Sequence, residues 1–195
     1  MRLLAILVLL PVLAHAQGFK PFDYLRDPGN LQIQIKELVG AKPSFAQRKP
    51  EGSEGGQSAT IIPGQDSVDF HANGITAWFE YQYSTKSPHL TWPGFDLDKH
   101  VTSYKWFAQA QMQGSATPYS RGTAVGTYRL FTYKPPQGER WCAVGTLSHS
   151  ASFNAERLTY IVCRPPGRSM TPTEAKTILD AVGTKAMPAT AASAL

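Results

Sequence analysis

Between residues 59 and 163, apolar and polar side chains alternate in repeated short runs, which is the pattern of β-strands with one buried face. Clusters of Asn, Gly and Pro typical of turns separate these runs. Because the separations are too short for crossover helices, we expect neighbouring strands to be antiparallel. The expected strands are 75–84, 103–112, 123–133, 141–148 and 159–163, with short edge strands at 59–62 and 68–70.

A helical pattern follows the strands. Thr171, Pro172 and Glu174 have the spacing of a capping box with proline in the first turn, and Gly183 stands where the helix should end. A single apolar stripe lies between these signals, and such a stripe packs on a sheet face. We therefore predict an α+β fold, an antiparallel, meander-like sheet of about five to seven strands with a C-terminal amphipathic helix packed on one face. The stripe consists of Ala175, Ile178, Leu179 and Val182.

The part of the chain before residue 59 is less regular. Residues 31–39 fit both a helical face and a strand alternation, and we favour a short helix because Asp27-Pro28 can open it and Gly40 can close it. Residues 42–58 are rich in Gly and Pro and poor in apolar side chains, which predicts a flexible loop. The expected organisation is a leader at 1–16, an N-terminal segment at 17–58, a β-rich domain with its helix at 59–185 and a flexible tail at 186–195.

The first 16 residues have the pattern of a cleavable signal peptide. Arg2 precedes an apolar run from Leu3 to Leu13, and the small residues of Ala14-His15-Ala16 precede Gln17. The run is shorter than the ~20 residues that a spanning helix needs, and no later stretch reaches that length. We expect a mature chain without a membrane span, located in the periplasm or secreted. The lack of an Asn-x-Ser/Thr sequon favours a bacterial exported protein.

Cys142 and Cys163 are the two cysteines of the chain. Outside the cytoplasm they should be oxidised, whereas a catalytic thiol or a metal site fits two distant cysteines without a CxxC motif poorly. If they oppose each other on antiparallel strands, Gly145 faces Tyr160 and leaves room for its ring. We predict a structural disulfide across a hairpin that turns at 152–153. The same register opposes Ala143 to Val162, Val144 to Ile161 and Thr146 to Thr159.

Composition narrows the classes of function. Hydrophobic residues make up 42% of the chain and charged residues 17%, which is typical of a globular protein with a sizeable core. The formal net charge of +5 is spread along the sequence, and its longest basic run is Arg48-Lys49. Because phosphate binding requires clustered basic residues, we expect no nucleic-acid partner. No motif indicates a cofactor, so none is expected.

Two histidines carry the catalytic hypotheses. His149 has a serine on each side, but a nucleophile and base pair would also need an orienting group and a strained turn, and no GxSxG motif occurs. Asp96, Asp98 and His100 would share one face of a strand and could bind a hard cation, yet Pro93-Gly94 indicates a loop. We interpret both segments as polar loops and expect no bound metal. A small exported hydrolase using His149 or His100 is the alternative.

Aromatic side chains are the most distinctive feature of the β-rich region. Exposed aromatic rings stack on sugars or form hot spots for protein partners. In a thin sheet they more often form the core and cross-strand pairs, which is the interpretation we favour. The candidate binding surface consists of Trp78, Tyr81, Tyr83, Trp92 and Trp106.

The sequence contains no convergent set of acid, base and nucleophile, so we expect a protein that binds rather than catalyses. The hypothesis is a small non-catalytic binding or accessory protein of the bacterial cell envelope, such as an inhibitor or immunity-type protein, with a protein or cell-wall partner. The alternatives are the hydrolase above and a structural envelope component held by its sheet edges. A pocket lined by ionisable groups would favour the enzyme, and an aromatic patch would favour binding.

Overall fold

A computed structural model describes residues 31–38, 41, 43–48, 64–84, 95–151, 154–184 and 186–195. The expected signal peptide at 1–16, the strand at 59–62 and Trp92 lie outside the described residues. Within the described part, none of the helices has the length and apolar character needed to cross a bilayer.

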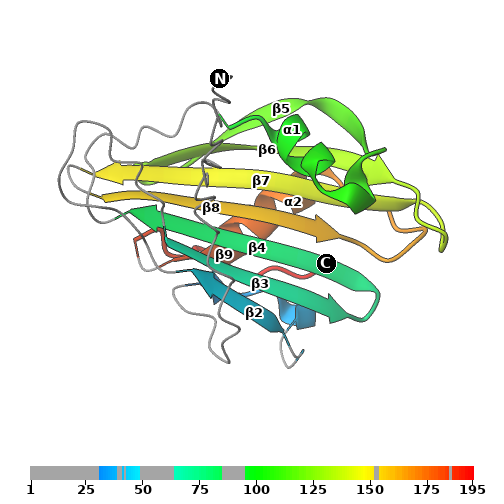
Figure 1. Ribbon diagram of the computed structural model, residues 1–195, viewed down its shortest axis with the longest axis horizontal. Coiled ribbons are helices and arrows are strands. Elements are labelled where there is room, and N and C mark those ends of the chain that lie inside the picture. The colour runs from blue at the N-terminus through cyan, green and yellow to red at the C-terminus, as the bar shows by residue number, and fades with distance from the viewer. Residues whose placement is uncertain are drawn as a thin grey trace, which may run out of the picture.

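A seven-stranded antiparallel sheet forms the centre of the molecule (Figure 1). The first three strands form one meander and the last four form another, and the two meet where β4 pairs with β8, giving the order β2-β3-β4-β8-β7-β6-β5. The fold class predicted from the sequence is confirmed, with the C-terminal helix on one face. The strands are β2 (Ser44–Arg48), β3 (Gly64–Ala72), β4 (Ile75–Ser84), β5 (Gln111–Arg121), β6 (Ala124–Tyr133), β7 (Arg140–Ala151) and β8 (Asn154–Cys163).

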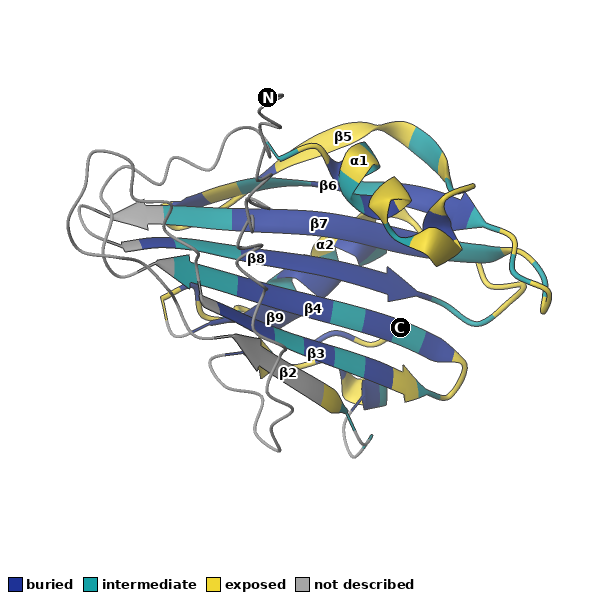
Figure 2. Ribbon diagram, viewed as in Figure 1, coloured by how far each residue is buried: buried dark blue, intermediate teal, exposed yellow. Residues whose placement is uncertain are grey.

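Each face of the sheet has its own core. On one face, helix α2 (Pro172–Ala181) packs over β6 and β7, and its residues Ile178 and Leu179 are fully buried. On the other face lie the short helix α1 (Leu97–Ser103) and the 3₁₀ helix η2 (Lys105–Phe107), which cover the disulfide. Figure 2 shows buried residues running along β7, β8 and β4 between the two layers.

The predicted strand at 103–112 is wrong for most of its length. The Asp96 side chain accepts hydrogen bonds from the backbone N–H groups of Asp98 (3.0 Å) and Lys99 (3.1 Å), which caps a helix that the alternation of later residues concealed. Leu97 and Val101, four residues apart, are the buried face of that helix. Only residues 111–112 of the predicted strand lie in β5.

The favoured helix at 31–39 is also wrong. Its first part forms the two-residue strand β1 (Gln32–Ile33), which pairs with β9 (Val182–Gly183), and only Lys36–Leu38 turn, as the 3₁₀ helix η1. The backbone explains this, because Gln34 N–H donates to the carbonyl of Ala181 at 2.8 Å instead of to its own chain segment. Long-range pairing therefore overrides the local helical pattern.

Two segments expected to be flexible join the fold. Ser44–Arg48, inside the predicted loop at 42–58, pairs with β3 as an edge strand. The tail at 186–195 was expected to be flexible, but it packs against the end of α2. Arg121 donates to the carbonyls of Leu179, Val182 and Met187, each at 2.9 Å. One arginine thus satisfies carbonyls at the end of α2 and holds the tail against it.

The hairpin of β7 and β8 has the predicted register. Cys142 and Cys163 are bonded, with their Cα atoms 4.0 Å apart, and Gly145 faces Tyr160. The last pair is Ala151 with Asn154, so the expected turn at 152–153 falls between the described ends of the strands. The remaining predicted pairs, Ala143 with Val162, Val144 with Ile161 and Thr146 with Thr159, are also confirmed.

The capping box that the sequence predicts for α2 is present. Glu174 N–H donates to Thr171 Oγ1 at 3.2 Å, and Thr171 N–H donates to Glu174 Oε2 at 2.7 Å. Thr171→Ala should lower the free energy of unfolding by ~1 kcal/mol because it leaves the Glu174 N–H without its acceptor. Thr177→Ala, on the same helix, is the control and should have little effect. Equal urea midpoints for the Thr171 variant and wild type would contradict the cap.

Candidate functional site

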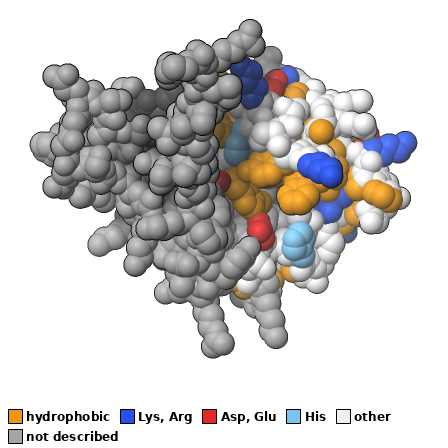
Figure 3. Space-filling model, viewed as in Figure 1, with side chains coloured by type: hydrophobic (Ala, Val, Ile, Leu, Met, Phe, Trp, Pro, Cys, Tyr) orange, Lys and Arg blue, Asp and Glu red, His pale blue; other side chains and the backbone are white. Residues whose placement is uncertain are grey.

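A cavity of about 490 Å³ opens on the α1 face, between η2 and the hairpin of β3 and β4. Five of its ten described lining residues are Trp, Tyr or Phe, and we call it the aromatic cavity. Figure 3 shows this face of the molecule, where hydrophobic side chains gather beside the part drawn in grey. Its polar wall residues are Asp69, His71 and Thr76. Its aromatic wall residues are Trp78, Tyr104, Trp106, Phe107 and Tyr133.

The sheet supplies one side of the aromatic cavity. Asp69 pairs with Trp78 across β3 and β4, and His71 pairs with Thr76 two residues further along. Because alternate residues of a strand point to the same face, the register brings these four side chains together. The turn between them contains Asn73, the one described residue other than glycine with a positive φ.

The helical layer supplies the other side. Phe107 is buried, with its ring edge-on to Phe131 at 5.3 Å and to Tyr133 at 4.8 Å, so it anchors η2 to the sheet. The preceding residue, Trp106, is 73% exposed, and its ring lies parallel to that of Tyr104 at 6.3 Å. The anchor therefore holds a large exposed ring at the rim of the aromatic cavity.

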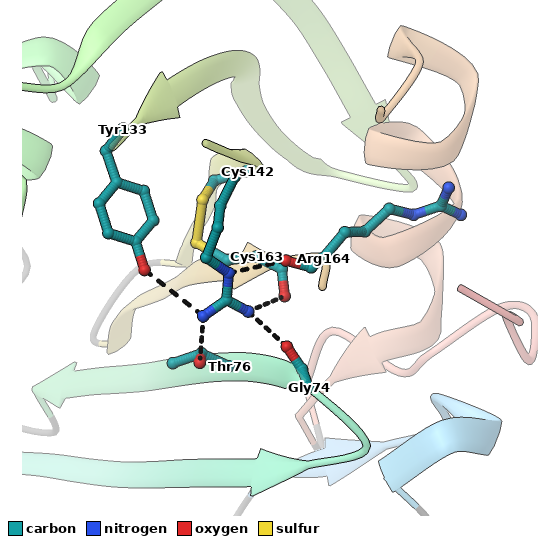
Figure 4. The surroundings of a disulfide bond; sticks show 7 residues. Gly74, Thr76, Tyr133, Cys142, Cys163 and Arg164 are labelled. Atoms are coloured by element: carbon teal, nitrogen blue, oxygen red, sulfur yellow. Dashed lines mark hydrogen bonds between the residues drawn. A yellow bond between two sulfur atoms is a disulfide. The ribbon is translucent and has the colours of Figure 1, made fainter. Parts of the chain in front are cut away.

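Arg140 hydrogen-bonds both to residues of the wall and to carbonyls beside the disulfide. Figure 4 shows these partners around the bonded cysteines. Its guanidinium donates to Thr76 Oγ1 at 3.1 Å and to the Tyr133 hydroxyl at 3.5 Å, both from wall residues. It also donates to the carbonyls of Arg164 at 2.8 Å and Cys163 at 3.3 Å, beside the disulfide. Arg140 thus positions two wall residues from the end of the sheet that carries the disulfide. No local sequence motif indicated this role.

Asp69 is the one carboxyl group of the described wall. Burial raises the pKa of its carboxyl above the usual value, and the nearby His71 opposes this shift. Burial, followed by the charges of Glu80 and Asp69, also raises the pKa of the Tyr104 hydroxyl. No lysine or arginine of the described residues lines the aromatic cavity. The wall therefore combines aromatic rings with one partly desolvated carboxylate.

His100, a residue of the hydrolase hypothesis, is packed among aromatic rings. Its ring centroid lies 4.8 Å from that of Phe95, 5.4 Å from that of Tyr104 and 5.6 Å from that of Trp78. Burial, with a smaller contribution from the charge of Arg157, lowers the pKa of the imidazole to about 4. Within the described part of the chain, its buried Nε2 has no hydrogen-bond partner. The expected polar loop is wrong here, because this histidine belongs to α1.

This packing makes stability depend on pH. An unfolded histidine has a pKa of ~6.5, so between about pH 6.5 and 4 the unfolded chain binds a proton that folded His100 does not. The resulting stability is present above that window and lost as the pH falls through it. Between pH 7.5 and 4.5, the free energy of unfolding measured in urea should therefore fall by about 1–3 kcal/mol less for His100→Phe than for wild type. Exposed His71→Gln is the control; equal losses in the His100 variant and wild type would contradict the account.

The two aspartates near His100 have structural partners. Asp96 caps α1, and both carboxylate oxygens of Asp98 accept from Arg129 Nη1 at 2.7 Å. The i, i+2, i+4 spacing would place the three side chains on one face only in a strand, so the helix separates their roles. Among the residues that the structure describes, no three or more His, Cys, Asp or Glu residues are placed to hold a metal ion.

His149 lies in β7 rather than in the expected polar loop. Its Nδ1 is 3.0 Å from Thr123 Oγ1, and Glu156 faces it across the hairpin. Glu156 accepts from Thr184 Oγ1 at 3.4 Å. Burial, followed by the charge of Glu156, raises the pKa of the Tyr81 hydroxyl. A hydroxyl and an imidazole therefore meet at this end of the sheet, but the described hydrogen bonds include none from the histidine to a carboxylate that would orient it as a base.

The structure divides the predicted aromatic surface between two faces. Trp78 and Trp106 both line the aromatic cavity. Tyr81 is buried in the core on the α2 face, where its ring stacks on that of Tyr83 at 5.2 Å. The sequence interpretation missed Asp69, Tyr104, Phe107 and Tyr133 as members of one site. The alternation typical of a strand could be recognised for some of these residues in the sequence. Whether they meet in one site depends on how the segment that joins β4 to β5 folds, because Tyr104 and Phe107 belong to it.

No protein-family model, curated protein or solved structure matches this chain.

Proposed function

We propose that this chain is an exported, non-catalytic binding protein of the bacterial cell envelope that engages a protein or cell-wall partner through the aromatic cavity. The observation that carries the proposal is the position of Trp106, 73% exposed at the rim of a cavity walled by four further aromatic rings. The pattern of residues 1–16 and the bonded cysteines support export.

The rim is built as a binding surface would be. Tryptophan and tyrosine offer large contact areas with few rotatable bonds, and they dominate the energetics of protein interfaces. The parallel ring of Tyr104 and the buried anchor Phe107 restrain Trp106 before any partner arrives. A partner would therefore lose little conformational freedom of this rim on binding. The cavity volume also lies within the range of pre-formed ligand sites, ~300–1,000 Å³.

The chemistry of the two histidines gives the hydrolase alternative little support. His100 stays neutral at pH 7 but its Nε2 is buried, so it cannot reach a substrate without moving α1. His149 meets a threonine hydroxyl, yet the described hydrogen bonds include none to a carboxylate that would orient it as a base. A serine nucleophile at Ser148 would point to the opposite face of β7.

The structural alternative depends on free sheet edges. The edge strand β5 carries Pro118, and its register with β6 shifts between Gln113 and Thr117. Proline and irregular pairing are features that protect an edge from joining another sheet. This edge is therefore poorly suited to hold a neighbouring subunit.

Affinity capture with a matched pair of variants tests the proposal. Among the residues that the structure describes, Trp106 and Val125 are the two exposed large hydrophobic residues. Of these two, only Trp106 lines the aromatic cavity. Mature wild-type protein, Trp106→Ala and Val125→Ala should each be incubated with envelope extract of the producing cells, and the retained molecules compared by mass spectrometry. We expect a partner that wild type and the Val125 variant retain and the Trp106 variant loses.

Two results would overturn the proposal. Retention of the same partners by all three proteins would remove the role of the aromatic cavity. Hydrolysis of an envelope component by wild type, lost in His149→Ala but kept in Trp106→Ala, would favour the enzyme instead. Far-UV circular dichroism and the unfolding midpoint of each variant show whether a loss of binding reflects a loss of folding.

A further inference from the structure

We propose that the aromatic cavity recognises a lysine or arginine side chain of a protein partner, with Asp69 as its counter-ion. This inference rests on the proposed function and specifies the partner's chemistry. The cationic group would lie beside Asp69 and the aromatic rings of the wall, and its aliphatic stem would pack against the same rings.

The charge of the wall points to a cation. The chain carries a formal net charge of +5, yet the described wall residues include no lysine or arginine and one aspartate. Burial penalises the charged form of Asp69, and the nearby His71 offsets only part of that penalty. A cation placed beside this carboxylate would gain from the attraction without having to displace a lysine or arginine of the described wall. The guanidinium of Arg140 contacts the wall residues Thr76 and Tyr133, but it also donates to the backbone carbonyls of Arg164 and Cys163. Asp69 therefore offers a carboxyl group to an incoming cation although the protein as a whole is basic.

The aromatic rings add to this attraction. The face of an aromatic ring attracts a cation within about 6 Å, and tryptophan does so most strongly. Trp78 lines the aromatic cavity from β4 and Trp106 lines it from η2. Tyr104 stands between α1 and η2 and completes the aromatic enclosure. The methylene groups of a lysine or arginine stem would pack against the same rings.

A polyol such as a sugar fits the wall less well. Each buried hydroxyl needs a hydrogen-bond partner, and an unpaired one is costly. Thr76 and Tyr133, two of the wall hydroxyls, already accept hydrogen bonds from Arg140. Phe107 and Ile161 are apolar parts of the same wall. A ligand with one concentrated polar group on an apolar stem matches this distribution better than a ring with a hydroxyl on most carbons.

The exposed rim argues for a chain-borne cation. Trp106 presents most of its surface to solvent, and the adjacent Lys105 is exposed as well. A free small amine inside the aromatic cavity would leave this surface uncovered, whereas the backbone around a lysine or arginine of a partner would cover it. The commitment is therefore to a side chain of a protein.

The test uses short blocked peptides with the purified mature protein at one ionic strength. Acetyl-Gly-Lys-Gly-amide and acetyl-Gly-Arg-Gly-amide are compared with the norleucine peptide, which keeps the stem and lacks the charge, and with methyl glucoside. Binding is followed by NMR of the indole N–H signals of Trp78 and Trp106. Trp141, which packs against the core on the other face, is the internal control.

The two cationic peptides should shift the signals of Trp78 and Trp106 saturably and leave Trp141 unchanged. The norleucine peptide should bind about tenfold more weakly, and Asp69→Asn should remove most of that difference and leave the part that the aromatic rings supply. Exposed Glu139→Gln changes the net charge equally and should keep the whole difference. Because burial opposes the charge of Asp69, its Asn variant should fold at least as stably as wild type at neutral pH.

Three outcomes would overturn the inference while leaving the proposed function intact, provided that Trp106-dependent capture persists. These are equal binding of the norleucine and lysine peptides, preferential binding of methyl glucoside, and no saturable shift up to about 50 mM of either cationic peptide. If the peptides bind as expected but capture from envelope extract does not depend on Trp106, the cation site stands and the proposed function fails.

Discussion

Gly145→Ala should lower the free energy of unfolding by about 3 kcal/mol or more. A Cβ atom at this position would lie 2.3 Å from Cε1 of Tyr160, the residue opposite on β8. The ring cannot retreat at low cost, because it is fully buried and its hydroxyl donates to the carbonyl of Ala175 on α2 at 2.8 Å. The added methyl group therefore strains the contact between sheet and helix.

A double-mutant cycle separates this clash from a general effect of the substitution. In the Tyr160→Leu background the ε carbon is gone, and alanine in a strand interior is ordinarily favoured over glycine by about 0.5–1 kcal/mol. Gly145→Ala should therefore be neutral or slightly stabilising there. Urea unfolding of the four proteins gives the coupling energy, and a similar destabilisation in both backgrounds would show that Tyr160 does not cause the effect.

Replacing both cysteines should cost nearly as much. The bridge joins residues with a sequence separation of 21, and the chain-entropy model gives ~3 kcal/mol for a loop of this size. Both sulfur atoms are fully buried, so Cys142→Ala with Cys163→Ala also leaves a small void in the core under α1. The urea midpoint of the double variant should fall accordingly.

The disulfide contribution can be separated from the void. Wild-type protein can be unfolded, reduced and refolded in the presence of a reductant. It then keeps both sulfur atoms as thiols but lacks the bond between them. If its unfolding free energy falls by ~3 kcal/mol as well, the bond rather than the packing of the sulfur atoms is responsible. Stability equal to that of the oxidised protein would contradict a structural role for the bridge.

The structure could be predicted best where several features of the sequence indicated the same contact or element. The two cysteines of the chain allow one intramolecular pairing, and Gly145 opposite Tyr160 selects the register, so the hairpin could be predicted residue by residue. The helix α2 was predictable because its cap, proline and apolar stripe agree. In both cases several independent signals indicate the same structure.

Single local signals were misleading. The alternation of Tyr104, Trp106 and later residues resembled a strand, whereas the cap at Asp96 starts a helix and the chain then crosses to the far edge of the sheet. That crossing brings Trp106 to the aromatic cavity beside Trp78, from a strand distant in the sequence. Two members of the candidate site could be named from the sequence, but their shared location depends on a topology that no local pattern encodes.

The most direct measurement for the central claim is photo-crosslinking at the rim of the aromatic cavity in the producing cells. Benzoylphenylalanine would replace Trp106 in one strain and Val125 in another, since both side chains are exposed and only the first borders the cavity. We predict one abundant adduct with an envelope partner from position 106 and none from position 125. Adducts from position 125 alone, or none from either position in envelope-located protein, would contradict the claim that this chain binds its partner through the aromatic cavity.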